Sequence, residues 1–473
     1  MSDERLTMLS AAAAAAEIAS GAVSAEDFTR ACLARISGIE DEIGAFAHLD
    51  PEYALAQARA CDEHRTMGGT LGPLHGVPVA IKDIIDTRDY PTEYGSPLYA
   101  GRRPSHDATV VARLRSAGAV ILGKTVTTEF AYFHPGKTRN PHDVTRTPGG
   151  SSSGSAAAVA SGMVPLALGT QTNGSLIRPA SFCGVFAAKP THGLISRNGV
   201  LSLSRALDHV GPFARTLEDL ALLLEILAGY DPGDEDTRMI AVPQFRKAAV
   251  EGFPLAPRFA FVRTPVWNEA DAATKAVFEQ LAVALGEHCF VLDLPERYAE
   301  AWPALRRIMA ADMAHRFGAV VDSRGEGVSE ETRKLIAEGR KVTATQYLAA
   351  LDFARALAIG LDSIFEDCNA VITPATIGVA PSGLAATGNP AFCTLWTLTG
   401  LPSLSLPLLQ GEGGLPLGVQ LVGARNDDMR LFRTANWLIN QLAANPGGKA
   451  AAKKASAKKD LTKSPKPSKP RTR

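Results

Sequence analysis

The segment PGGSSSGSAAAVASGMVPLALGTQTNGSLIRPA, residues 148–180, contains two turns of small residues on which the rest of the interpretation depends. Its alanine-rich middle, Ser155–Ser161, predicts a helix, because alanine has the strongest helix propensity. Val164–Leu168 is a short apolar run, which predicts a buried strand. One helix and one strand thus join a serine-rich turn to a second turn, and we expect this return of the chain to bring Ser151 and Ser175 close together.

Short apolar runs also precede this segment. Val77–Ile81 and Ala119–Leu122 are typical of buried strands that end at polar loops, and Asp107–Ala117 between them has helical spacing. This alternation predicts an α/β core with a largely parallel sheet. Further strands are predicted at Ala370–Pro374, Leu404–Leu406 and Gly418–Val422, and helices in residues 1–65 (one opened by Ser24), at Thr216–Ala228, through most of 237–360 and at Met429–Leu438.

The composition is that of a globular protein, with 46% hydrophobic and 21% charged residues. Its net charge of zero hides an asymmetry: residues 447–473 hold eight Lys, two Arg and one Asp, a net +9, so the other 446 residues carry −9. We therefore predict a single folded domain over 1–446 and a disordered basic tail over 447–473. An acidic body does not favour nucleic-acid binding by the folded part.

Cysteine usage and hydrophobicity indicate a cytoplasmic location. The six cysteines are scattered without a CxxC pair or a Cys/His cluster, so neither a zinc site nor a disulfide framework is predicted. The apolar run Ala11–Ala16 follows acidic Asp3 and Glu4 and is short, which favours a surface helix over a signal peptide. The two long uncharged stretches, 147–177 and 368–411, are broken by glycine, serine and proline, so no membrane span is predicted.

A serine nucleophile needs a base, and the residues alone leave more than one candidate. Gly150–Gly154 is a formal GxSxG match, but no strand precedes it as that motif requires, so we take the match as accidental. Ten histidines leave a Ser-His-Asp triad open. Lys82 follows the apolar run 77–81, and a lysine buried there would have a lowered pKa and could act as a neutral base. A solvated lysine at a strand end is the alternative.

About half of the chain, roughly 71–229 and 367–439, resembles the amidase signature family. The resemblance rests on GPLHGVPVAIKDIIDT (72–87), ILGKTVTTEFA (121–131), the segment 148–180, FCGVFAAKPTHGLIS (182–196) and GLPLGVQLVGAR (414–425). It implies a single α/β domain with a twisted mixed sheet covered by helices on both faces. It also implies hydrolysis of a small carboxamide to a carboxylate and ammonia through an acyl-enzyme, without a metal or organic cofactor.

The resemblance assigns roles residue by residue. Lys82 matches the catalytic lysine of that family, Ser151 the bridging serine that follows a cis peptide bond, and Ser175 the nucleophile. The oxyanion hole would be formed by the backbone N–H groups of Thr172, Asn173, Gly174 and Ser175.

Three positions depart from the commonest family pattern. Gln171 replaces an Asp, Asn173 replaces a Gly, and Arg178 follows the nucleophile by three positions where two are usual. Gln171 and the late arginine are similar to the malonamidase and carboxybiuret-hydrolase-like branch, which implies that Thr170, Gln171 and Arg178 bind the substrate. The partner of Arg178 would be either a carboxylate on the substrate or a protein carboxylate such as Asp208.

Two other functions remain open at this stage. The A subunit of a glutaminyl- or asparaginyl-tRNA amidotransferase shares the signature; the basic tail favours it, whereas Gln171 and Arg178 do not fit it. A decayed enzyme that serves as a scaffold would explain Asn173 but not the presence of all three triad residues. We expect a small-molecule amide as the partner and keep a homodimer as a possibility.

Overall fold

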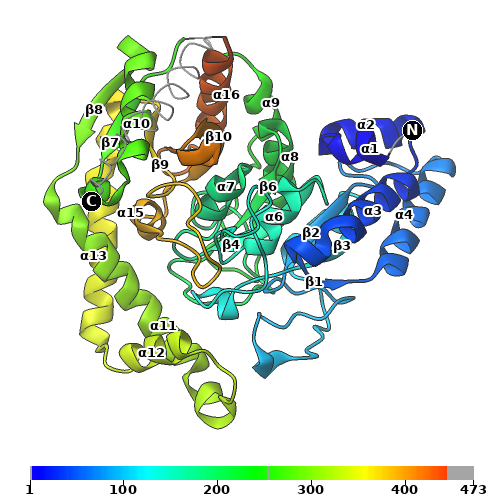
Figure 1. Ribbon diagram of the computed structural model, residues 1–473, viewed down its shortest axis with the longest axis horizontal. Helices are drawn as coiled ribbons and strands as arrows, with labels where there is room; N and C mark the ends of the chain where they lie inside the picture. Colours follow the sequence, from blue (N-terminus) through cyan, green and yellow to red (C-terminus); the bar gives the residue numbers. More distant parts are fainter. Residues whose placement is uncertain (1–2, 254, 445–473) are drawn as a thin grey trace, which may run out of the picture.

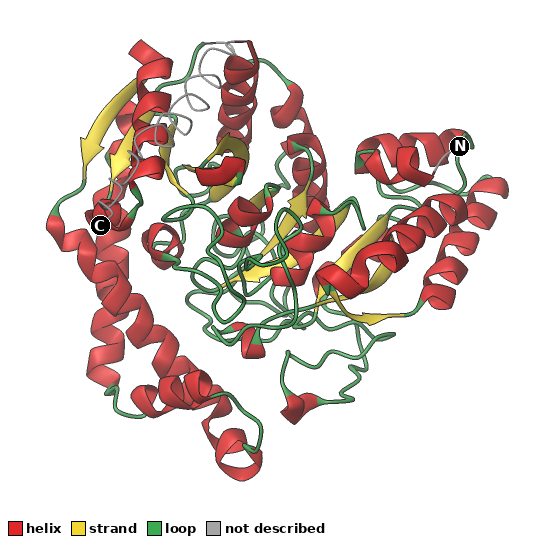
Figure 2. Cartoon of the chain, viewed as in Figure 1, coloured by secondary structure: helices red, strands yellow, loops and turns green. Residues whose placement is uncertain are grey.

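The computed structural model describes residues 3–253 and 255–444, which form one α/β domain built on an 11-stranded sheet (Figure 1). Helices cover both faces of this sheet (Figure 2). The strands are β1 Phe46–Leu49, β2 Pro78–Lys82, β3 Val120–Thr125, β4 Leu166–Gln171, β5 Phe186–Lys189, β6 His209–Ala214, β7 Phe259–Arg263, β8 Cys289–Asp293, β9 Ala370–Pro374, β10 Ser403–Gln410 and β11 Pro416–Val422. The α-helices are α1 Asp3–Met8, α2 Ala11–Ser20, α3 Ala25–Ile43, α4 Pro51–Thr66, α5 Thr109–Ser116, α6 Ser153–Ala160, α7 Ile177–Cys183, α8 Leu217–Leu227, α9 Phe245–Val250, α10 Ala272–Leu285, α11 Ala301–Arg324, α12 Glu330–Gly339, α13 Ala344–Asp362, α14 Ile364–Asp367, α15 Ala391–Leu398 and α16 Asp428–Ala444.

The sheet is mixed, with the strand order β1-β3-β2-β4-β6-β5-β10-β11-β9-β7-β8. Parallel pairing is confined to β3-β2-β4 and β9-β7-β8, and the remaining neighbours are antiparallel. The prediction of a largely parallel sheet from strand–helix alternation was therefore wrong, because the central strands β4, β6, β5, β10 and β11 run alternately up and down. The mixed sheet implied by the family resemblance is confirmed.

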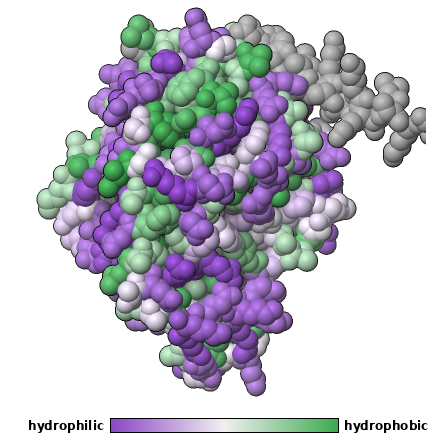
Figure 3. All heavy atoms as spheres, turned by 90° about the vertical axis from the view of Figure 1, so that its left-hand side faces the viewer, coloured by the Kyte–Doolittle hydropathy of each residue, from purple (hydrophilic) through white to green (hydrophobic). Residues whose placement is uncertain are grey.

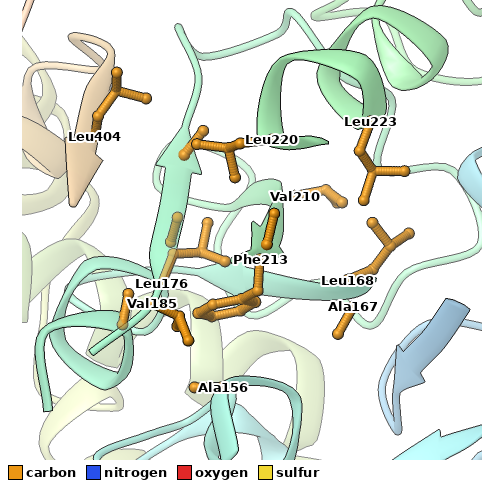
Figure 4. Packing of buried hydrophobic residues seen from close by; sticks show 14 of the residues in the cluster. Ala156, Ala167, Leu168, Leu176, Val185, Val210, Phe213, Leu220, Leu223 and Leu404 are labelled. Atoms are coloured by element: carbon orange, nitrogen blue, oxygen red, sulfur yellow. The ribbon is translucent and has the colours of Figure 1, made fainter. Parts of the chain in front are cut away.

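Buried side chains of the central strands show how the two helical layers are held (Figure 4). Phe213 of β6 packs against Ala156 of α6, whereas Val210 lies toward α8 near Leu220, as the period-2 alternation of a strand requires. A Cβ at residue 169 of β4 would lie 2.6 Å from the Phe213 ring and 2.7 Å from Ser152 Oγ. Glycine at this position therefore lets the serine-rich turn and the sheet approach closely.

Most of the predicted elements are present. Ser24 and Thr216 cap α3 and α8 through their side chains, as the sequence predicted. Five strands were missed: β1 lies within the region predicted as helical, β7 and β8 lie within 237–360, and β5 and β6 lie in a stretch for which no strand was predicted. Both β7 (FAFVR) and β8 (CFVLD) contain a run of four apolar residues, but such a short run does not by itself distinguish a strand from a helix within a region of helical pattern.

Hydrophobic side chains at the surface are scattered over several elements. Figure 3 shows the side on which β8 and α13 lie, where hydrophobic residues gather in the upper half and hydrophilic ones below. Exposed apolar side chains such as Val291 and Ile359 come from different elements and not from one continuous helix face. Across residues 3–253 and 255–444, every helix is too short or too polar to span a bilayer. The predicted basic tail, 447–473, falls outside the described residues.

Candidate active site

Lys82 is the last residue of β2, a central strand that is paired on both sides by parallel neighbours. Its side chain is fully buried. The Nζ atom lies 2.8 Å from Ser151 Oγ and 2.8 Å from Thr170 Oγ1. The structure thus brings together the predicted base, the predicted bridging serine and Thr170, and it excludes a solvated lysine at this strand end.

Burial governs the ionisation of Lys82. Desolvation lowers the pKa of the Lys82 amine well below its usual value, and the charge of Asp208 opposes this shift only in part. A neutral amine has a lone pair, so Nζ can accept the proton of the Ser151 hydroxyl while it donates to Thr170. The site therefore holds a lysine suited to act as a base.

The serine-rich turn is fixed to the end of β4. The peptide bond between Gly150 and Ser151 is cis, and the Ser151 carbonyl accepts from Thr128 N at 3.2 Å. The Ser152 hydroxyl donates to Thr170 O at 3.1 Å and accepts from Thr170 N at 3.2 Å. Ser152 therefore ties the turn to the strand that leads to Ser175. Sequence reasoning missed this role, because nothing distinguishes Ser152 within a run of three serines.

Ser175 lies in the turn between β4 and α7 and is 7% exposed. In the part of the chain that the structure describes, its side chain forms no hydrogen bond, and the backbone N–H groups of Asn173, Gly174 and Ser175 have no acceptor. These donors are available to a substrate oxygen, as an oxyanion hole requires. The roles of Ser175 and of these N–H groups remain predictions.

Gln171 shapes this turn from inside the protein. Its Oε1 accepts from the backbone N–H groups of Leu176 and Ile177 at 2.8 and 3.0 Å, and its Nε2 donates to Thr397 Oγ1 at 2.9 Å. Both ends of the amide are thus occupied by the protein. The geometry supports a positioning role for Gln171 more than the predicted contact with substrate.

Asn173 is held by the helix α15. Its Oδ1 accepts from Thr394 Oγ1 at 2.9 Å, and its backbone carbonyl accepts from Thr397 Oγ1. The Asn173 Nδ2 atom is buried without a partner among the described residues. Sequence reasoning missed Thr394 and Thr397, which lie more than 200 residues further along the chain and belong to no local motif.

Arg178 is 2% exposed and donates to two backbone carbonyls. Nη1 lies 2.6 Å from Gly388 O and Nη2 lies 2.7 Å from Gly150 O, while Nε is buried and finds no partner within the described part of the chain. Of the two partners left open for Arg178, the protein carboxylate Asp208 is not the one observed, because it accepts from Thr172 Oγ1 at 2.7 Å and from the backbone of the 203–204 turn. Desolvation lowers the pKa of Arg178 to about 10.

Side chains of the types that ligate metals are dispersed over the structure. Within 3–253 and 255–444, no group of three or more His, Cys, Asp or Glu side chains is arranged to hold a metal ion. The groups that converge at the site are its serines, its lysine and its backbone donors.

A protein-family model and curated relatives both match most of this chain. The model of the Amidase family matches residues 27–432. The chain is 38% identical over 468 residues to the A subunit of the glutamyl-tRNA(Gln) amidotransferase of Chloroflexus aurantiacus, covering 90% of this chain and 95% of that protein.

Solved structures extend the match to the fold. One is a chain from a vestigial protein complex that bears on the origins of an s-triazine catabolic enzyme, with a TM-score of 0.85 and 31% identity over 91% of this chain and 98% of that one. Another is the peptide amidase of Stenotrophomonas maltophilia, with a TM-score of 0.79 and 30% identity over 92% and 97% of the two chains. The chain belongs to the amidase signature family, whose members hydrolyse amide C–N bonds.

Proposed function

We propose that this protein hydrolyses a primary carboxamide to a carboxylate and ammonia through an acyl-enzyme on Ser175. The observation that carries the proposal is the buried Lys82 amine, 2.8 Å from Ser151 Oγ. Neutral Lys82 takes the proton of Ser175 through Ser151 as Ser175 Oγ attacks the amide carbon. Backbone N–H groups of residues 172–175 stabilise the oxyanion that forms.

The proton then returns by the same route. Protonated Lys82 donates through Ser151 to the leaving nitrogen, so that the C–N bond breaks and ammonia departs. Water next attacks the ester of Ser175, with Lys82 again as the base, and releases the carboxylate. The direct test is ammonia release from acetamide, butyramide, asparagine and glutamine by the purified full-length protein; no release from any of them would contradict the proposal.

The pH dependence of the rate should report the buried lysine. We expect kcat/KM to rise with pH, because only neutral Lys82 can accept a proton. The midpoint of this rise should give an apparent pKa well below the ordinary lysine value, and the rate should level off above it. The Asp208→Asn variant should move this acidic limb to lower pH, since the charge of Asp208 raises the pKa of Lys82. Rate profiles of both proteins, measured from about pH 5 to 10, check the sign. A limb that moves to higher pH would contradict the assignment.

Arg178 is proposed to position the Ser151 turn. Because its Nη atoms hold the carbonyls of Gly150 and Gly388, Arg178→Ala should lower kcat by a similar factor for butyramide and for malonamate. It should also lower the stability by about 2 kcal/mol or more, since two buried carbonyls lose their donors. Kinetics with both amides and a thermal melt measure this. A large rise in KM for malonamate alone would instead support the carboxylate-bearing substrate that the sequence suggested.

A second candidate function is that of an amidotransferase A subunit. The 38% identity to the Chloroflexus aurantiacus protein over 90% of this chain favours it. In that role the same site would release ammonia from glutamine within a complex with other proteins. Purification of tagged protein from its own cells, followed by mass measurement, distinguishes a hetero-complex from a homodimer or a single chain. Glutaminase activity that depends on a co-purified protein would favour this second function.

A further inference from the structure

A cavity of about 600 Å³ lies beside the catalytic turn. Its wall is largely hydrophobic and comes from segments far apart in the sequence. Phe133 lies five residues after Thr128, whose backbone N–H donates to Ser151 O. Trp302 is the second residue of α11, and Phe392 and Leu395 belong to α15. A volume of this size is typical of sites that bind small organic molecules.

Hydrogen bonds connect the wall of this cavity to the catalytic turn. Thr394 lines the cavity and donates to Asn173 Oδ1, two residues before Ser175. Gly388 also lines the cavity, and its carbonyl accepts from Arg178. A Cβ at residue 174 would lie 2.9 Å from Pro390 Cβ, another wall residue, so the turn backbone rests directly on the wall. The wall of the cavity therefore packs directly against the turn that carries Ser175.

The charges around the cavity restrict what can enter it. Glu269 is the one charged side chain among its described lining residues, and its carboxylate accepts from Asn389 Nδ2 at 2.7 Å. The described wall thus offers no cation to a substrate carboxylate. Burying an ion without a partner is costly, whereas burying an apolar group is favourable.

We propose that this cavity binds the acyl substituent of the substrate and that the preferred substrates are primary amides of apolar acids, with acyl groups of hexanoyl to 3-phenylpropanoyl size. The inference rests on the proposed hydrolysis of a primary amide, because ammonia is then the leaving group and only the acyl side can carry the apolar group. Glutamine, whose acyl side bears both an ammonium and a carboxylate, is a poor fit to this wall.

The first experiment compares chain lengths with the full-length protein. From acetamide through butyramide to hexanamide, kcat/KM should rise by roughly fourfold for each added methylene group. The value for 3-phenylpropanamide should be at least as high as that for hexanamide, and glutamine should fall below butyramide. A flat series, or a preference for glutamine, would overturn the inference while leaving amide hydrolysis itself intact.

A substitution that fills the cavity tests whether the acyl group of the substrate binds there. Ala391 is a partly exposed wall residue at the start of α15, so Ala391→Phe adds a ring to the cavity. We expect it to lower the ratio of kcat/KM for hexanamide to that for acetamide by at least tenfold. The matched control is Ala349→Phe on the exposed side of α13, which should leave this ratio unchanged. An unchanged ratio in Ala391→Phe would place the acyl group elsewhere.

Binding without turnover separates this inference from the proposed function. Ser175→Ala should still bind 3-phenylpropanamide in calorimetry, with a negative heat-capacity change that marks apolar burial. Adding Ala391→Phe to this variant should weaken that binding by at least tenfold. Binding that survives Ala391→Phe would count against the cavity, whereas normal binding by a wild-type protein that hydrolyses no amide would count against the proposed function alone.

Discussion

Ser175→Ala is expected to lower kcat by about 10⁴–10⁶-fold, because the proposed mechanism forms the acyl-enzyme on the Ser175 hydroxyl. The fold should be retained, since the change removes one hydroxyl that forms no hydrogen bond among the described residues. Ammonia release under saturating amide measures the loss, and a thermal melt checks the fold. A fluorophosphonate probe, which reacts with activated serines, should label the wild type and fail to label the variant.

The control for this change is a neighbouring serine. Ser153 begins α6 in the same serine-rich segment, and its hydroxyl donates to Val126 O at 3.3 Å. Ser153→Ala should keep kcat within about tenfold and should still be labelled, because it removes one backbone hydrogen bond and no reacting atom. Labelling that persists in Ser175→Ala would place the nucleophile at a different serine.

The centre of the site could be predicted because its motifs are local. Lys82 ends an apolar run that is long enough for one buried strand, and Ser151 and Ser175 bracket one helix and one strand, so short-range patterns place them. The structure adds the 2.8 Å contact between Lys82 and Ser151. Side-chain geometry of this kind depends on two strands, β2 and β4, and on the serine-rich turn, and it cannot be read from any one of these segments.

The supporting residues could not be predicted for the same reason. Thr394 and Thr397 reach the catalytic turn from α15, and no pattern near either residue indicates what it touches. The observed partners of Arg178 could not be predicted for a related reason. A buried arginine suggested a carboxylate, but backbone carbonyls at Gly150 and Gly388 satisfy its Nη donors. Carbonyls are present at every residue, so sequence gives no signal for such a contact.

Lys82→Met should lower kcat by about 10²–10⁴-fold, because both proton transfers of the proposed mechanism pass through the amine. Methionine keeps most of the volume, so the loss reports the base and not a cavity. Lys82 has no carboxylate within salt-bridge distance among the described residues, and burying an unpaired amine is costly. The melting temperature of Lys82→Met should therefore stay the same or rise.

Lys124 provides the matched control, since it is also fully buried and lies in the neighbouring strand β3, where it pairs with Ile81, the residue before Lys82. Its Nζ lies 3.3 Å from Asp83 Oδ1 and 3.2 Å from Pro91 O. Lys124→Met leaves the carboxylate of Asp83 buried without its cation, so it should lower the melting temperature while kcat stays within about tenfold of the wild type. Lys82→Met should thus lower kcat without lowering the melting temperature, whereas Lys124→Met should lower the melting temperature with little change in kcat. If Lys82→Met kept more than about a tenth of the wild-type kcat, the proton acceptor would have to be a group other than this lysine.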